Sequence, residues 1–248
     1  MHEDSTDIRT RAHARRKVAA MRAVLFDMDG TLVDSEKLWD VSLAALYDRL
    51  GGVITDELRT ALVGSSAENT IKTIFADLGL DPDPVAMAEA DRYLHTYTGE
   101  LFATRGLPWC DGARELLDSL AGEGVPMALV TNTQRELTEQ ALGSIGRHYF
   151  TVTVCGDEVP HGKPRPDPYR LAARLLDVEP GHCLAVEDSV TGTLAAELAG
   201  CPVLVVPNDV VVPRTPRRHH LESLRGLAVD DLRTIHAEID AASGERTA

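Results

Sequence analysis

The sequence has few cysteines, and its apolar residues do not form long runs. Four of the 248 residues are cysteines, and because none belongs to a CxxC pair, zinc ribbons and thioredoxin-like redox centres are excluded. Widely spaced, unpaired thiols are typical of a protein from a reducing compartment. No apolar run approaches the ~18 residues of a transmembrane helix, and the first residues lack the hydrophobic region of a signal peptide. We therefore expect a cytoplasmic protein that does not act at a membrane.

Basic residues are also scarce relative to acidic ones. Asp and Glu number 39 against 25 Lys and Arg, which gives a formal net charge of −14. Such a surface repels polyanions, so nucleic acid is not an expected partner. A small anionic substrate is compatible with this charge if a metal ion or a local lysine receives it. No pattern in the sequence indicates an oligomeric state.

Several common ligand-binding motifs are missing. Residues 156–163 resemble a nucleotide-binding loop, but five residues separate the two glycines and Pro164 stands where Walker A requires Ser or Thr. The sequence contains neither GxGxxG nor the GxSxG nucleophile elbow. His161 and the pair His219-His220 have no partner at metal-ligand spacing, and we expect these histidines to be solvated.

From residue 22 onward, short apolar runs alternate with amphipathic segments. The apolar runs predict buried strands at 22–26, 126–131, 150–155, 183–187 and 202–206. Helical periodicity predicts helices at 112–121, 136–145, 169–176 and 191–199, and a last one near 229–241. This alternation is typical of the α/β class, in which helices cover both faces of a doubly wound parallel sheet.

One segment, 36–104, interrupts the alternation. It has no convincing strand, and its periodicity predicts helices near 38–50, 56–63, 68–78 and 84–101. We expect a helical cap domain inserted after the first strand, which leaves 21–35 and 105–248 as the core domain. Residues 1–20 are polar, arginine-rich and without apolar periodicity, and are predicted to be a disordered tail.

Polar residues follow several of the predicted strands. Asp27 and Asp29 end the first, Thr131-Asn132 the second, and Asp188 the fourth, while a loop before the fourth carries Lys163. Ligands of doubly wound sheets bind beyond these strand ends. Each residue taken singly is more often a helix cap, a turn or a surface charge. Their joint placement instead predicts a site in which Asp27 and Asp188 bind Mg²⁺ through carboxylate oxygens.

The spacing of the first two carboxylates predicts the chemistry. Residues i and i+2 of an extended chain face the same side, so one aspartate can attack a substrate while the other moves the proton. An aspartyl phosphate divides a difficult hydrolysis into two easier steps. Lys163 and Mg²⁺ would neutralise the phosphoryl charge. The residues therefore predict a Mg²⁺-dependent phosphohydrolase with Asp27 as its nucleophile.

Four motifs in order resemble the haloacid dehalogenase superfamily, in its branch with a helical cap, over roughly residues 22–207. They are DMDGT at 27–31, Thr131 followed by Asn132, GKPRPDPY at 162–169 and EDSVTG at 187–192. The resemblance implies a Rossmann-like core, with Asp27 as nucleophile and metal ligand. It implies Asp29 as general acid/base that also binds metal through its carbonyl. Thr131 and the Asn132 backbone would bind phosphoryl oxygens, Lys163 would neutralise the intermediate, Asp188 would bind Mg²⁺, and Glu187 would support these ligands.

Departures from the family pattern narrow the expected activity. True dehalogenases lack an acid at the position of Asp29. β-Phosphoglucomutases carry a histidine where this sequence has Trp39, and a G-x-S-R arginine where it has Ala67 in the stretch 64–67. The stretch 34–39, DSEKLW, resembles bacterial hexitol and 2-deoxyglucose-6-phosphate phosphatases and would place Glu36 and Trp39 at the mouth of the site. A core position for Trp39 is the equally weighted alternative.

These comparisons favour a phosphatase of small phosphate monoesters, sugar or polyol phosphates first. A β-phosphoglucomutase-type sugar phosphomutase is the second hypothesis. A receiver-like switch protein needs neither a second catalytic aspartate nor a cap, so Asp29 and residues 36–104 argue against it.

Overall fold

The computed structural model describes residues 20–244 except 63, 64, 66 and 209. The tail predicted for 1–20 therefore lies outside the described residues, apart from Ala20. Gly64 and Ser66 of the stretch compared with the mutase motif lie outside them as well. None of the helices in the described part of the chain is long and apolar enough to cross a bilayer.

The centre of the molecule is a parallel sheet of six strands in the order β3-β2-β1-β4-β5-β6. The strands are β1 (Ala23–Phe26), β2 (Met127–Val130), β3 (Val152–Val154), β4 (Cys183–Glu187), β5 (Val203–Val205) and β6 (Arg218–His220). The five predicted strands are present, and all except β4 are slightly shorter than expected. Strand β6 was not predicted from the sequence, because its residues are polar and follow prolines. The histidines predicted to be solvated, His219 and His220, are half buried in this edge strand, whereas His161 is exposed.

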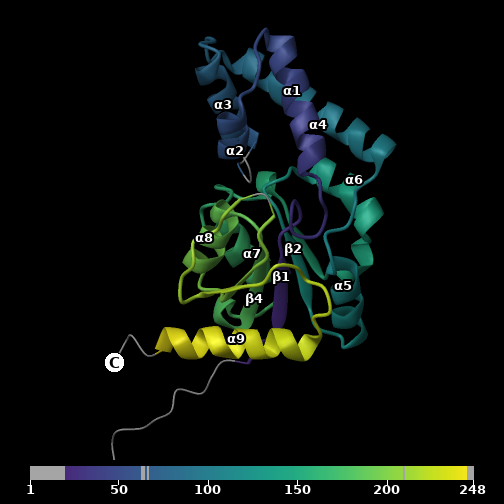
Figure 1. Cartoon of the computed structure of the whole chain (residues 1–248), viewed down its shortest axis with the longest axis vertical. Coiled ribbons are helices and arrows are strands. Elements are labelled where there is room, and N and C mark those ends of the chain that lie inside the picture. Colours follow the sequence, from purple (N-terminus) through teal and green to yellow (C-terminus); the bar gives the residue numbers. More distant parts are fainter. Residues whose placement is uncertain (1–19, 63–64, 66, 209, 245–248) are drawn as a thin grey trace, which may run out of the picture.

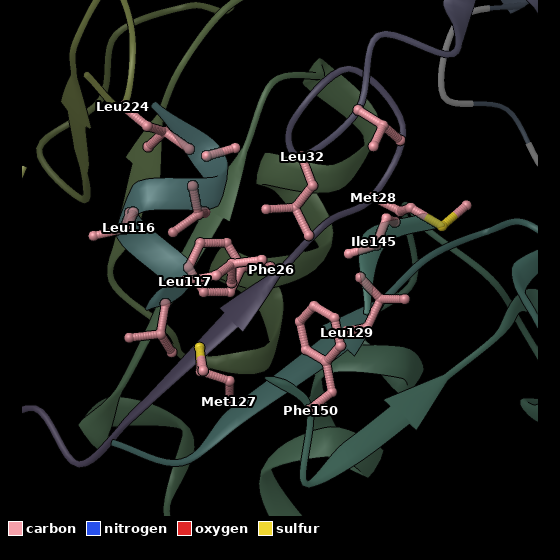
Figure 2. Close-up of a cluster of buried hydrophobic side chains, with 14 of the residues drawn as sticks. Phe26, Met28, Leu32, Leu116, Leu117, Met127, Leu129, Ile145, Phe150 and Leu224 are labelled. Atoms are coloured by element: carbon pink, nitrogen blue, oxygen red, sulfur yellow. The ribbon is translucent and has the colours of Figure 1, made fainter. Parts of the chain in front are cut away.

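Alternation along the buried strands separates two apolar layers. Val24 and Phe26 of β1 face one cluster, whereas Ala23 and Leu25 face another, as the two-residue period of a strand requires. The first cluster is covered by α5 (Ala113–Gly122), α6 (Arg135–Ile145) and α9 (Val229–Gly244), and the second by α7 (Asp167–Leu175) and α8 (Val190–Ala199). Figure 2 shows the first cluster, in which Phe26 lies among side chains from β2, α5 and α6.

Four helices form the cap at one end of the molecule, opposite α9 (Figure 1). They are α1 (Glu36–Leu50), α2 (Asp56–Leu62), α3 (Ala67–Asp77) and α4 (Pro84–Arg105). Helix α4 begins at a strong start signal, because the Asp83 side chain accepts a hydrogen bond from Ala86 N and Pro84 takes the first helical position. The cap has its own apolar cluster around Tyr47, Ile74 and Leu94.

This architecture confirms the predicted fold class, a doubly wound α/β core with an inserted helical cap. The division into core and cap domains at 35/36 and 104/105 stays a prediction. Helix α1 begins at Glu36, and α4 continues one residue past the predicted boundary, to Arg105.

Candidate active site

Three neighbouring strands deliver the predicted residues to one edge of the sheet. Strand β1 lies between β2 and β4. Asp27 follows β1 directly, Thr131 follows β2, and Asp188 follows β4. Because the strands are parallel, their carboxyl ends lie together. All three residues line a cavity at this edge of the sheet.

The glycine of the first motif allows two acidic loops to approach. Gly30 has a φ of +79°, which favours glycine, and a Cβ at this position would lie 2.2 Å from Asp188 Oδ2. The adjacent Thr31 hydroxyl donates to Asp188 Oδ1 at 3.5 Å. The DMDGT turn therefore packs directly on the acidic loop after β4.

Three buried carboxylates form the part of the site that suits a metal ion. Ligand atoms of Asp27, Glu187 and Asp188 all lie within 4.8 Å of one another, and each residue is at most 7% exposed. One ammonium group, that of Lys163, is paired with this cluster, which leaves an excess of two negative charges when all three carboxylates are ionised. Hard oxygen ligands with this excess charge fit a divalent cation such as Mg²⁺.

Lys163 is held by two of these carboxylates. Its Nζ donates to Asp27 Oδ1 and, at 2.6 Å, to Glu187 Oε1. Burial opposes its charge, but the carboxylates of Asp27 and Glu187 together raise the pKa of Lys163 above its ordinary value. The ammonium therefore stays protonated beside Asp27.

Glu187 positions this lysine, and both of its carboxylate oxygens accept hydrogen bonds. Besides Lys163, its carboxylate accepts hydrogen bonds from the Tyr169 hydroxyl at 2.5 Å and from the Ser189 hydroxyl at 3.2 Å. A Cβ on Gly192 would lie 2.0 Å from both Glu187 oxygens, so the last glycine of EDSVTG leaves room for this carboxylate. Asp27 and Asp188 are thus the side chains best placed to bind a metal, and Glu187 supports them.

The Asn132 side chain also holds Lys163. Its Oδ1 accepts from Lys163 N at 2.8 Å, and its Nδ2 donates to Lys163 O at 3.1 Å. This pair of bonds fixes the backbone of the lysine loop. The amide side chain is therefore a positioning group, and phosphoryl binding by the Asn132 backbone stays a prediction.

Four donors surround the carboxylate of Asp29. Oδ2 accepts from Thr133 Oγ1 at 2.8 Å and from Thr131 Oγ1 at 3.3 Å. Oδ1 accepts from Ser35 Oγ at 2.5 Å and from Trp39 Nε1 at 3.3 Å. Thr133 and Ser35 were not predicted from the sequence as site residues. Their signal was weak, because a hydroxyl residue two positions after Thr131 or just before a helix is common in any turn.

Trp39 satisfies both interpretations that the sequence left open. Its indole N–H contacts Asp29, and its ring packs edge-on against His95 and Phe102 with centroid distances of 6.0 and 6.5 Å. It therefore belongs to the site and to the apolar packing of the cap. Glu36, one helical turn earlier, also lines the cavity.

Cap and core residues together line a cavity of about 120 Å³ next to these groups. The residues that α1 contributes lie three, four and seven positions after Glu36, and residues at these spacings share one face of a helix. The cap residues that line the cavity are Glu36, Trp39, Asp40, Leu43, Arg59, Leu62, Ser65, Thr70, Leu94 and His95. Of these the sequence analysis had selected only Glu36 and Trp39.

Burial changes the acidity of the two predicted metal ligands. It raises the pKa of Asp27 to about 7, against the attraction of Lys163 and with a contribution from Glu187. Burial, followed by the charges of Asp27 and Glu187, raises the pKa of Asp188 well above its ordinary value. A bound cation would stabilise the ionised form of these buried carboxylates and so lower their pKa values.

Comparisons with known proteins agree with this geometry. A family model described as "Haloacid dehalogenase-like hydrolase" matches residues 24–206. Phosphoglycolate phosphatase of Thiobacillus denitrificans is 31% identical over 75% of this chain and 83% of its own length. Hexitol phosphatase A of Escherichia coli is 33% identical over 78% of this chain and 86% of its own length.

A solved structure shares this architecture over most of the chain. CbbY from Rhodobacter sphaeroides, crystallised with phosphate, superposes with a TM-score of 0.76 at 29% identity and covers 86% of this chain and 99% of its own. The family match spans most of the chain and includes all four motifs. The chain therefore belongs to the haloacid dehalogenase-like hydrolase family, as a phosphoric monoester hydrolase.

Proposed function

We propose that this enzyme hydrolyses small sugar or polyol phosphates with Mg²⁺, through a phosphorylated Asp27. One observation carries the proposal. Asp27 and Asp188, at two adjacent strand ends, lie together with Lys163 from the loop before α7, and the cap lines the same cavity. A small cavity between the cap and the core favours a small ester over a polymer.

In the first step an oxygen of Asp27 attacks the phosphorus atom. The bond from phosphorus to the leaving oxygen breaks, and Asp29 donates a proton to that oxygen. In the second step Asp29 takes a proton from water, which attacks the phosphorus of the aspartyl phosphate and releases inorganic phosphate and free Asp27. Lys163 offsets charge on the phosphoryl group, and Thr131 with the Asn132 backbone would bind its oxygens.

Asp27 and Asp188 would hold the Mg²⁺ ion, with the carbonyl of Asp29 as the third proposed protein ligand. When bound, the ion would neutralise negative charge on the nucleophile and the phosphoryl oxygens. Glu187 also holds the Lys163 ammonium beside Asp27, which provides a second positive charge in the site. A cytoplasmic location stays a prediction from the sequence.

The names of the relatives support a phosphatase more than a mutase. They include a hexitol phosphatase and, at 31% identity, a phosphorylated carbohydrates phosphatase of Thermotoga maritima. The similarity to a β-phosphoglucomutase structure is 19% in sequence and concerns the fold alone. The phosphomutase hypothesis is therefore not favoured.

The proposal is tested by phosphate release from a panel of sugar, polyol, glycolate and nucleotide monophosphates, with and without Mg²⁺. We expect Mg²⁺-dependent release from sugar or polyol phosphates, and loss of at least about a thousandfold in kcat for Asp27→Asn because the nucleophile is gone. Asp230→Asn, an exposed acid on α9, is the matched control. Comparable activity in Asp27→Asn, or product isomers without net phosphate release, would overturn the proposal.

A further inference from the structure

The cap wall of the cavity contains an ion pair that no step of the hydrolysis uses. Arg59 of α2 donates from Nη1 to Oδ2 of Asp40 on α1, and both residues line the cavity. Their side chains are 42% and 29% exposed, so they can reach a ligand. Neither residue belongs to the four motifs of the core.

This pair removes the positive charge that a second anionic group would need. The basic side chains among the described cavity-lining residues are Arg59, Lys163 and His95, and each is already paired with a carboxylate, His95 with that of Asp91 at 3.3 Å. The cap side of the cavity also carries the carboxylates of Glu36 and Asp40. A carboxylate or second phosphate on the leaving group would meet this negative charge and would have to displace Asp40 from Arg59.

The same wall suits a neutral polyhydroxy chain. Asp40 presents carboxylate oxygens that accept hydrogen bonds, and Arg59 presents N–H groups that donate them, so neighbouring hydroxyls can satisfy both. Leu43, Leu62 and Leu94 line the cavity as well and offer apolar surface to the carbon chain. The ion pair and the leucines together therefore suit a sugar alcohol better than a leaving group that carries a carboxylate or a second phosphate.

We propose that the Asp40–Arg59 pair is a specificity determinant, which selects neutral polyhydroxy leaving groups and rejects those with a second carboxylate or phosphate. This inference rests on the proposed phosphatase function and names the part of the substrate that the cap recognises. The paired Arg59 is the element that an anionic leaving group would otherwise bind.

Two esters that differ in one group test the inference. Glucitol 6-phosphate and 6-phosphogluconate have the same six-carbon chain, but the second has a carboxylate at C1. We expect the wild-type protein with Mg²⁺ to prefer the glucitol ester by about tenfold or more in kcat/KM, because one charged contact is worth about this factor. The shorter pair, glycerol 3-phosphate and 3-phosphoglycerate, repeats the comparison.

Substitutions then assign the preference to the ion pair. Asp40→Asn frees Arg59 and should move the ratio of kcat/KM values toward 6-phosphogluconate by about tenfold. Arg59→Gln should not produce this gain, and the double variant Asp40→Asn/Arg59→Gln should lose it. Asp48→Asn, an exposed acid further along α1, is the matched control. Melting temperatures of all variants identify any that fail to fold.

The outcomes separate this inference from the proposed function. If wild-type protein prefers 6-phosphogluconate, or Asp40→Asn changes both esters by the same factor, the inference is wrong and the phosphatase function stands. Release of phosphate from sugar phosphates but from none of the polyol esters has the same meaning. If the wild-type protein releases phosphate from none of these esters with Mg²⁺, the proposed function itself fails.

Discussion

Trp39 of the cap donates a hydrogen bond of 3.3 Å from its indole nitrogen to Oδ1 of Asp29 in the core. The proposed general acid/base is thus bound directly by a cap residue. Ser35, Thr131 and Thr133 supply its other bonds from the loops of the core. Orientation of Asp29 therefore depends on where helix α1 lies.

Replacing the indole tests this dependence. Trp39→Phe keeps an aromatic ring against His95 and Phe102 but removes the N–H donor. We expect kcat to fall about tenfold, because one hydrogen bond to a charged group contributes about 1.5 kcal/mol, with little change in melting temperature. Trp109→Phe is the control, because Trp109 packs on the core without lining the cavity. Equal losses in both variants would contradict the role of Trp39.

Magnesium should stabilise the protein independently of catalysis. A cation relieves the repulsion among Asp27, Glu187 and Asp188, so Mg²⁺ should raise the melting temperature, by ~2.7 kcal/mol of unfolding free energy at a hundredfold excess over Kd. Because the pKa of Asp27 is raised to about 7 and that of Asp188 is also raised, protons compete with the ion at low pH. The stabilisation should therefore be larger at about pH 8 than at about pH 6.

The control for magnesium is Asp188→Asn at the same ionic strength. This variant should respond much less, because it lacks a carboxylate ligand. A rise in melting temperature of the same size in both proteins would mean that the ion binds elsewhere.

Two glycines should respond in opposite directions to alanine. At Gly192 a Cβ would lie 2.0 Å from the Glu187 oxygens, so Gly192→Ala must displace the group that holds Lys163. We expect a loss of about 1–3 kcal/mol in stability and a lower kcat. At Gly143, inside α6, a Cβ meets no atom within 4 Å, and Gly143→Ala should gain about 0.5–1 kcal/mol with unchanged activity. Chemical denaturation and kinetics measure both, and similar effects at the two sites would refute the argument.

His95 should make stability depend on pH. Its Nδ1 lies 2.9 Å from the Asp91 carbonyl and 3.3 Å from the Asp91 carboxylate. Burial opposes the charged ring, but Asp91 outweighs it, with a smaller contribution from Asp157, and the pKa of His95 is raised above its ordinary value. A raised pKa in the folded state means stabilisation that is complete below about pH 6.5 and is lost as pH rises through the folded value.

The measurement is the difference in unfolding free energy between wild type and His95→Gln. We expect about 0.5–1 kcal/mol at low pH, decreasing toward alkaline pH. His161→Gln, at an exposed histidine, is the matched control. A difference that stays constant across the series would show that the His95–Asp91 ion pair contributes nothing.

The core of the site was predictable because it follows from local sequence and one topological rule. Asp27, Thr131 and Asp188 each follow a short apolar run, and parallel strands place their carboxyl ends together. The edge strand β6 was not predictable, because Arg218–His220 has no apolar pattern and pairs only by its backbone with β5. Its strand conformation depends on a neighbour that is distant in the sequence.

The sequence by itself determined the fold class, the cap insertion and the residues proposed for phosphoryl transfer, because short motifs and periodicity carry that information. The tertiary structure decided which side chains meet. It placed Thr133 and Ser35 on Asp29, the Asn132 amide on the Lys163 loop, and Arg59 on Asp40. These contacts depend on the relative orientation in which helices and loops pack. The spacing of residues along the chain does not determine that orientation.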